Sequence, residues 1–325
     1  MTSIPRHDLE ASDPSQLVPR PDVSVGIVTY NHERYIAQAI ESVLAQRTSL
    51  SFEVVIYEDC STDATRTIAL DYQRRHPDKI RVLYSAANVG VGENVRRGIA
   101  SYRGRYAAGL DGDDFWTDPL KLQTQFDALE ALPDVNLCFT RAAAVWPDGS
   151  RKSGWNYGAH DRLIPRSELL KTPGIVVPTS SLFFRTHVLH ESASWIFEAP
   201  VIDLFHVLAG VSPNGAYYVA REMAAYRVLA DGSWSSEQAA RYHSTKVVHS
   251  HRLLRALSLA EQSFGIQPRE LKLLRGLPHY VLARDAVAKG DYRGALWHMA
   301  RIGTRYPMVR IRQLLRLRSR REQPQ

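Results

Sequence analysis

The sequence contains few cysteines and no long apolar run. Its two cysteines, Cys60 and Cys138, cannot build a disulfide framework, and no zinc-type cluster accompanies them. No stretch of about eighteen consecutive apolar residues occurs, so we expect no transmembrane helix. Residues 1–20 combine mixed charge with three prolines and lack the apolar centre of a signal peptide. These features predict a protein of the reducing cytoplasm with a disordered leader over residues 1–22.

Positive charge is unevenly distributed along the chain. The net charge is +7, yet residues 237–325 alone hold 18 Lys and Arg against 6 Asp and Glu. A basic region of this kind can meet anionic lipid, a polyanionic glycan or nucleic acid. Nucleic-acid binding is not expected, because no recognised nucleic-acid-binding fold accompanies the charge.

Strand-like and helix-like patterns alternate through the first half of the chain. Short apolar runs rich in β-branched residues predict strands, and apolar residues at helical spacing predict helices between them. Strands are expected at residues 23–28, 52–57, 80–84 and 105–110, and helices at about 33–46, 63–76 and 93–102. The alternation predicts an α/β fold, in which helices cover both faces of a mainly parallel sheet.

Patterns in the second half of the chain are weaker. A helix is expected at residues 118–131 and 201–210, a strand at 135–146 and 176–185, and two short strands within 216–228. Residues 151–165 show little periodicity, which predicts a surface loop near a ligand. Beyond residue 236 the patterns are almost all helical. We therefore predict one domain over residues 23–236 and a basic helical region over residues 237–325.

The segment "GLDGDDFW" places three carboxylates within four residues, directly after a predicted strand. Like charges this close repel each other, so the segment is either an exposed acidic turn or a site for a cation. Alternate residues of an extended chain point the same way, so Asp111 and Asp113 can face one ion while Asp114 points elsewhere. Gly112 lets the backbone approach a ligand. Oxygen ligands suit Mg²⁺ or Mn²⁺, and a diphosphate would complete the coordination shell.

Loops that carry motifs follow the predicted parallel strands, where open sheets of this kind bind their ligands. The stretches "VSVGIVTYNHERYIAQAIESVLAQ", "FEVVIYEDCSTDAT", "NVGVGENVRRGI", "GRYAAGLDGDDFWTDPLKLQTQF", "PTSSLFFR" and "MAAYRV" occur in this order. Together they resemble the family 2 glycosyltransferases, which have the GT-A fold, over about residues 23–235. They look most like the bacterial branch that acts on cell-surface and exported polysaccharides.

The resemblance implies residues that hold a nucleotide-sugar donor, with UDP, GDP or dTDP as its nucleotide. Asp59 would accept a hydrogen bond from the base, although it can also be read as an acid at a helix N-terminus. Asp111 and Asp113 match the family's D-x-D pair, which binds ribose and the metal-diphosphate. Asn88 is either a ligand contact or a loop-capping amide. The other implied donor contacts are Thr29, Tyr30, Asn31, Gly112, Arg227 and Glu58, which stands where aspartate is common.

The resemblance also implies a catalytic base. Asp203, in "VIDLFHVLAG", matches the family's acid before a helix in the second half of the domain, although a helix N-terminal charge is the alternative. A carboxylate that deprotonates the acceptor hydroxyl opposite the departing diphosphate implies inversion at the anomeric carbon. The Q-x-x-R-W signature of processive members is absent, which favours the addition of single sugars.

One position departs from the family pattern, and others allow more than one role. After "YRV" this chain has Leu229 where close relatives have a histidine, which puts metal affinity and activity in question. Arg227 either pairs with a phosphate or forms a surface salt bridge. Asp114 is predicted either on the acceptor side or in the next turn, and Trp234 is predicted on the acceptor side.

The sequence predicts a metal-dependent, inverting, nonprocessive glycosyltransferase that acts on a glycan or lipid-linked acceptor. The alternative is a noncatalytic scaffold or nucleotide-sugar-binding protein at the membrane. A sugar nucleotidyltransferase would need a glycine-rich phosphate loop after the first strand, which "TYNHER" lacks. The basic amphipathic segment "RYPMVRIRQLLRLRSRR" would either lie on anionic lipid at the inner face of the plasma membrane or dock on the catalytic domain.

Overall fold

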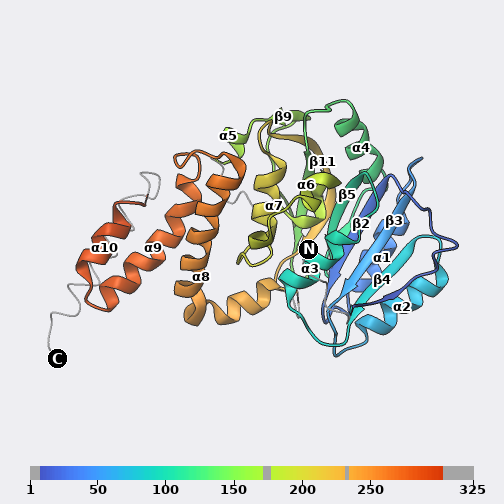
Figure 1. Ribbon diagram of the computed structural model, residues 1–325, viewed down its shortest axis with the longest axis horizontal. Coiled ribbons are helices and arrows are strands. Elements are labelled where there is room, and N and C mark those ends of the chain that lie inside the picture. Colours follow the sequence, from blue (N-terminus) through green and yellow to red (C-terminus); the bar gives the residue numbers. More distant parts are fainter. Residues whose placement is uncertain (1–7, 171–176, 231–233, 303–325) are drawn as a thin grey trace. The chain divides into compact units, whose positions relative to one another are not determined.

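The computed structural model describes residues 8–170, 177–230 and 234–302 (Figure 1). For residues 234–244 it describes the helical backbone and no side chain. The described residues fall into two compact units. The first unit comprises those within residues 1–166, 176–198 and 202–240, and the second those within 167–175, 199–201 and 241–325.

One mixed sheet forms the centre of the first unit. Its strand order is β1-β4-β3-β2-β5-β10-β7-β11-β6. The parallel half contains β4 (Ile80–Ser85), β3 (Phe52–Glu58), β2 (Val23–Thr29) and β5 (Tyr106–Asp111). The other half contains β10 (Leu182–Arg185), β7 (Leu137–Val145), β11 (Ala216–Arg227) and β6 (Phe115–Trp116), with β10 antiparallel to both of its neighbours.

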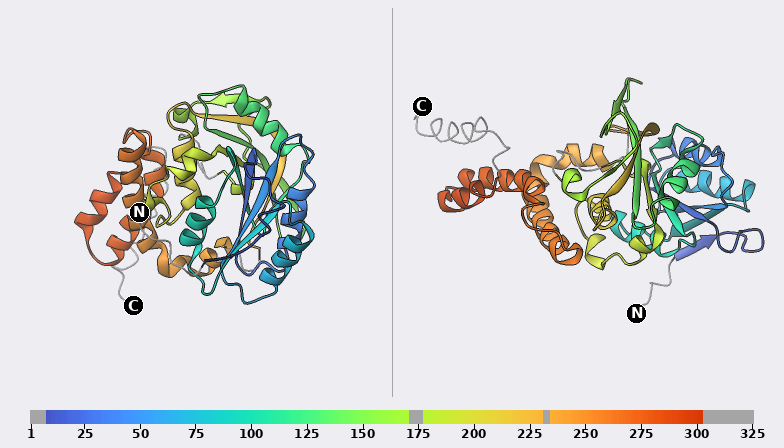
Figure 2. Two further views of the ribbon diagram at one scale, coloured as in Figure 1. Left: turned by 45° about the vertical axis from the view of Figure 1, so that its right-hand side comes forward. Right: turned by 90° about the horizontal axis from the view of Figure 1, so that it is seen from above.

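Helices cover both faces of this sheet (Figure 2). Alternate strand residues such as Val23, Val25 and Ile27 share one hydrophobic core with α1 (Ile36–Leu44), α2 (Thr65–Arg75) and α4 (Lys121–Glu130). The opposite face carries α3 (Val91–Ala100), which packs on β2, β3 and α6 (Thr186–His190), and α6 in turn packs on α7 (Ile202–Gly210). The predicted mainly parallel α/β fold is therefore confirmed.

Two glycines let α3 lie close to the sheet. A Cβ atom on Gly26 would lie 1.9 Å from the Tyr102 hydroxyl, and one on Gly98 would lie 2.5 Å from the Tyr57 ring. The two tyrosine hydroxyls are 3.0 Å apart and share a hydrogen bond. Burial of these hydroxyls raises the pKa of both tyrosines.

Part of the segment predicted as a disordered leader is ordered. Strand β1 (Asp8–Ala11) pairs antiparallel with β4, and Leu17 is buried. Glu10 forms an ion pair with Arg81 at 2.8 Å, and the positive charge holds the pKa of Glu10 below its usual range even though burial opposes this. The prediction of disorder was therefore wrong for residues 8–22, because these contacts join segments far apart in sequence.

Two predictions for the second half of the domain are corrected. Residues 151–165, predicted as a loop, contain β8 (Arg151–Gly154), which pairs with β7, and β9 (Arg162–Ile164), which pairs with β11. Strand β8 is almost wholly exposed, so it carries no alternating apolar pattern. The two short strands predicted within residues 216–228 are one strand, β11, whose register shifts at Glu222 interrupt the alternation.

The second unit is helical, as predicted. It contains most of α8 (Trp234–Phe264) together with α9 (Lys272–Ala288) and α10 (Tyr292–Met299), and α9 packs on α10. Among the described residues there are also three short helices, α5 (Arg166–Leu169), η1 (Thr179–Ser181) and η2 (Ser194–Ile196). In the described part of the chain, no helix combines the length and apolarity needed to cross a membrane. The predicted lipid-binding segment, residues 305–321, lies outside the described residues.

Candidate active site

The carboxyl ends of three neighbouring parallel strands bring the predicted site residues together. In the register of the sheet, Thr29 pairs with Glu58 and Val28 pairs with Asp111. Hydrogen bonding continues past the strand ends, because the Gly112 N–H donates to the Val28 carbonyl at 2.8 Å. The loops after β2, β3 and β5 therefore meet at one edge of the sheet, as ligand-binding loops do in open parallel sheets.

Asp111 and Asp203 are near neighbours at this edge, and both lie near Thr179. The Thr179 side chain lies near both carboxyl groups and lowers the pKa of each. Burial outweighs that effect and raises the pKa of both, and the nearby Asp203 charge raises that of Asp111 further. Two neighbouring buried carboxyl groups favour either a shared proton or a bound cation.

Gly112 is required by protein packing at the start of the loop after β5. A Cβ atom at this position would lie 2.6 Å from the Thr29 Oγ1 atom and 2.8 Å from the His32 Nδ1 atom. The glycine therefore lets the acidic loop lie against the end of β2, and a close approach to a ligand is not needed to explain it.

His32 was not among the residues predicted for the site. Its ring lies beside Gly112, and its Nδ1 atom is 3.3 Å from the Thr29 hydroxyl. Burial lowers the pKa of His32, and the charges of Asp113 and Asp63 oppose that effect. The sequence feature that could have identified His32 is its position in "TYNHE", directly after three residues that were predicted for the site.

Asp114 is fully buried, which argues against the predicted position on the acceptor side. Its Oδ1 atom accepts the backbone N–H of Arg227 at 2.8 Å. Its Oδ2 atom has no hydrogen-bonding partner among the described residues. Burial raises the pKa of Asp114 well above its ordinary value, and the charges of Asp113 and Asp111 add to the effect.

Protein groups surround the guanidinium of Arg227, which was predicted to pair with a phosphate or with a surface acid. It donates to the Asp113 backbone carbonyl and to the Gln38 side chain. Its Cζ atom also lies over two aromatic rings, 4.9 Å from the centre of the Tyr35 ring and 4.6 Å from that of the Phe115 ring. Burial lowers the pKa of Arg227. Two residues later, Leu229 is exposed and has a left-handed backbone with φ of 55°.

Asp59 and Asn88 both hold the loop that leads into α3. The Asp59 carboxylate accepts the backbone N–H of Val89 at 2.8 Å and that of Gly90 at 2.9 Å. Burial raises the pKa of Asp59 despite these two bonds. The Asn88 side chain accepts the Gly90 N–H at 3.1 Å, which is the loop-capping contact that the sequence allowed. Both residues thus have structural partners beside any contact with a nucleotide.

The other predicted donor contacts surround the ends of β2 and β3. Asn31 has a left-handed backbone, and its Oδ1 atom accepts the Thr62 N–H at 2.8 Å. Glu58 is fully buried and accepts hydrogen bonds from the Ser61 N–H and from Arg66. Thr29 is buried, whereas Tyr30 is partly exposed. The Trp234 side chain lies outside the described part of the chain.

The acidic cluster fits a divalent cation that takes few ligands from protein. Asp111 and Asp113 are oxygen donors, and the charges of Asp203 and Asp113 both raise the pKa of the buried Asp111, a repulsion that a cation would relieve. Among the described residues, no group of three or more His, Cys, Asp or Glu side chains is arranged as a cage that could hold a metal ion. Mg²⁺ commonly keeps waters and binds substrate phosphates instead of using such a cage. Asp111 and Asp113 would therefore hold the ion together with a diphosphate.

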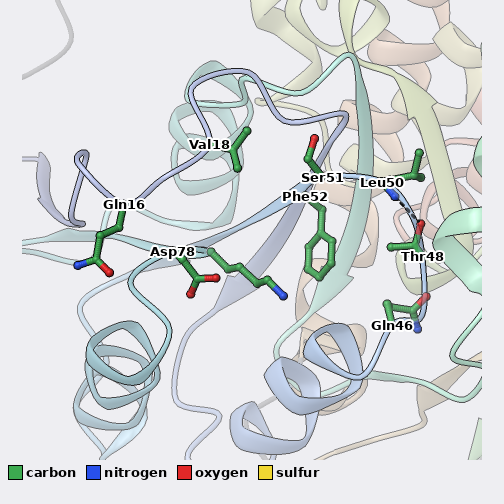
Figure 3. A pocket seen from close by; sticks show the side chains of 9 residues that line it. Gln16, Val18, Gln46, Thr48, Leu50, Ser51, Phe52 and Asp78 are labelled. Atoms are coloured by element: carbon green, nitrogen blue, oxygen red, sulfur yellow. Dashed lines mark hydrogen bonds between the residues drawn. The ribbon is translucent and has the colours of Figure 1, made fainter.

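A hollow of about 400 Å³ lies at the opposite ends of the strands (Figure 3). Phe52, at the start of β3, and Lys79, just before β4, line it together with Gln46, Thr48 and Asp78. The Lys79 amino group lies 5.0 Å from the Phe52 ring centre. None of the carboxylates described above lines this hollow. The candidate active site is therefore placed where those carboxylates gather, at the carboxyl ends of the parallel strands.

Comparison with known families matches this architecture and its motifs. The family described as Glycosyl transferase family 2 matches residues 24–190, which is just over half of the chain. The chain belongs to this family. A relative by sequence is TuaG of Bacillus subtilis, named as a candidate glycosyltransferase of teichuronic acid biosynthesis. It is 38% identical over 108 residues, covering 33% of this chain and 42% of TuaG.

A longer match joins this family 2 chain to an uncharacterized protein of Mycobacterium tuberculosis. The two are 33% identical over 214 residues, which make up 66% of this chain and 61% of that protein. This chain thus spans less than two thirds of the length of that relative.

Solved structures share the fold of this family 2 chain. S. aureus TarS in complex with UDP-GlcNAc superposes with a TM-score of 0.64 at 16% identity, covering 87% of this chain and 82% of TarS 1–349. The mannosyltransferase PcManGT of Pyrobaculum calidifontis, in complex with GDP-Man and Mn²⁺, has a TM-score of 0.55 at 17% identity. This match covers 90% of this chain and 78% of PcManGT. The predicted GT-A fold is thereby confirmed.

Proposed function

We propose that this family 2 chain is a glycosyltransferase of cell-surface polysaccharide biosynthesis. It transfers one sugar at a time from a nucleotide-sugar donor to a hydroxyl of a glycan or lipid-linked acceptor, with inversion at the anomeric carbon. It acts in the cytoplasm, and its basic region 237–325 contacts the inner face of the plasma membrane. The observation that carries the proposed transfer is the convergence of Asp111, Thr179 and Asp203 beside Asp113.

The donor would bind at the ends of β2, β3 and β5. Asp59, with Thr29 and Tyr30, would contact the base and ribose, while Asp111 and Asp113 would hold the diphosphate through Mg²⁺ or Mn²⁺. The ion supplies positive charge that stabilises the departing nucleoside diphosphate. Complexes of TarS with UDP-GlcNAc and of PcManGT with GDP-Man and Mn²⁺ support this assignment of donor class and metal.

Asp203 would act as the base. Its carboxyl group lies near Asp111, at the edge where the diphosphate would bind. The proton of the acceptor hydroxyl passes to the Asp203 carboxylate, and the acceptor oxygen forms a bond to the anomeric carbon. The bond between that carbon and the diphosphate oxygen breaks on the opposite face, which inverts the configuration.

A noncatalytic nucleotide-sugar-binding protein at the membrane is the second candidate. Leu229 favours it, because an exposed aliphatic side chain stands where close relatives have a histidine. The two candidates differ in turnover, since both would bind a nucleotide.

Calorimetry against UDP, GDP and dTDP, with and without Mn²⁺, identifies the nucleotide, and assays with the matching sugar nucleotides then measure hydrolysis or transfer. We expect metal-dependent binding and turnover. Asp203→Asn should lower kcat by about 10²- to 10⁴-fold and leave nucleotide affinity unchanged. Asp148→Asn, in an exposed turn, is the matched control. Binding without turnover on any acceptor would favour the second candidate, and no binding at all would refute both.

A further inference from the structure

Lys121 is a fully buried lysine at the first residue of α4. Its Nζ atom donates to the Gln125 Oε1 atom at 2.6 Å and lies 4.4 Å from the centre of the Trp116 ring. Among the described residues no carboxylate forms an ion pair with it, and burial lowers its pKa to about 7. A buried amino group without an ion-pair partner costs free energy of folding.

The two side chains that contact Lys121 hold two consecutive carbonyl groups. Because Oε1 of Gln125 faces Lys121, its Nε2 atom is the donor, and it bonds to the Ser181 carbonyl at 3.0 Å. The Trp116 Nε1–H donates to the Ser180 carbonyl at 2.9 Å. Lys121 thus contacts both side chains that donate hydrogen bonds to the carbonyl groups of the short helix η1.

Helix η1, which packs on β5, also contains Thr179, whose side chain lies near Asp111 and Asp203 and lowers the pKa of both. The methyl group of Thr179 fills the space left by Gly109, where a Cβ atom would lie 2.8 Å from it. Gly109 and Asp111 point to the same side of β5, so this packing directs the hydroxyl toward Asp111. A shift of Thr179 would therefore change the arrangement of both carboxylates.

We propose that Lys121 is a positioning residue for sugar transfer: through Gln125 and Trp116 it holds η1 so that Thr179 lies between Asp111 and Asp203. This inference rests on the proposed function. Misplacement of reacting groups by about 1 Å can cost about 10²-fold in rate, so the effect should appear in kcat.

The test compares Lys121→Met, Gln125→Glu and Thr179→Val in the full chain, with exposed Lys152→Met as the matched control. Lys121→Met removes the donor at similar length, and Gln125→Glu keeps an acceptor for Lys121 but loses the donor to Ser181. We expect each of these two variants to lower kcat for donor turnover by tenfold or more, with KM changed less than about threefold. The melting temperature of each variant, measured alongside, verifies folding.

A double-mutant cycle separates positioning from general structural damage. If Lys121 acts through Thr179, the pair Lys121→Met with Thr179→Val should have the same kcat as Thr179→Val alone. Losses that multiply, or a wild-type kcat in Lys121→Met and Gln125→Glu, would overturn the inference while leaving the proposed function intact. Absence of turnover in the unaltered protein would overturn the proposed function and this inference with it.

Discussion

Asp114 and Arg227 are joined by a hydrogen bond between the Asp114 Oδ1 atom and the Arg227 backbone N–H, 2.8 Å long. The Arg227 guanidinium also donates a hydrogen bond to the backbone carbonyl of Asp113, the residue before Asp114. These two bonds tie the end of β11 to the acidic loop after β5. The side chain predicted to bind phosphate therefore holds in place the backbone of the loop that would bind the metal.

Replacement of Arg227 by methionine should destabilise the protein even without a ligand. The change leaves the Asp113 carbonyl and the Gln38 side chain without their donor, which typically costs about 1–3 kcal/mol in the free energy of unfolding. Chemical denaturation measures this loss. Arg221→Met is the control, because Arg221 is an exposed residue of β11 whose ion pair with Asp118 should contribute at most about 1 kcal/mol. Equal stability of the two variants, with only donor affinity reduced in Arg227→Met, would instead support direct phosphate binding.

Replacement of Asp113 by asparagine should weaken metal-dependent donor binding. The change removes one negative charge from the cluster, and loss of a group in or around a metal site commonly lowers metal affinity about 10- to 100-fold. Titration with Mn²⁺ in the presence of the nucleotide identified by calorimetry measures this loss. Asp148→Asn should bind as the unaltered protein does, since Asp148 lies in an exposed turn and accepts the Ser150 N–H. Unchanged Mn²⁺ dependence in Asp113→Asn would contradict the D-x-D assignment.

The sequence predicted the parallel half of the sheet and the position of its carboxylates, because both depend on local patterns. Where β and α elements alternate, the carboxyl ends of the parallel strands lie at one edge of the sheet. Thr29, Asp59 and Asp111 were therefore expected at that edge. Thr179 could not be found in this way. It follows Pro178 in a segment whose sequence pattern predicts a strand. Only the pairing of β10 with β5 brings this segment beside Asp111. The partners of Arg227 likewise depend on tertiary packing.

Replacement of Gly109 by alanine should displace Thr179 and lower kcat. The added Cβ atom would lie 2.8 Å from the Thr179 methyl carbon, closer than atoms can pack. A second change, Thr179→Ser, removes that methyl group but keeps the hydroxyl, so the double variant should recover much of the lost activity. Gly154→Ala is the control, because its nearest neighbour would be 3.6 Å away. Failure of Thr179→Ser to restore activity would show that Gly109 acts in some other way.

Lys121 should make the stability of the protein depend on pH between about 7 and 10. Its pKa is about 7 in the folded protein and has the ordinary value of 10.5 when the chain unfolds. Between these values the unfolded chain binds a proton that the folded protein does not, so the free energy of unfolding rises with pH by at most about 1.4 kcal/mol per unit. Below pH 7 both states are protonated and this dependence disappears. Urea denaturation at pH 7, 8 and 9 measures the slope. Lys121→Met should have a smaller slope than the unaltered protein, whereas Lys152→Met should retain it; equal slopes in all three would mean that the Lys121 amino group stays protonated throughout this range in the folded protein.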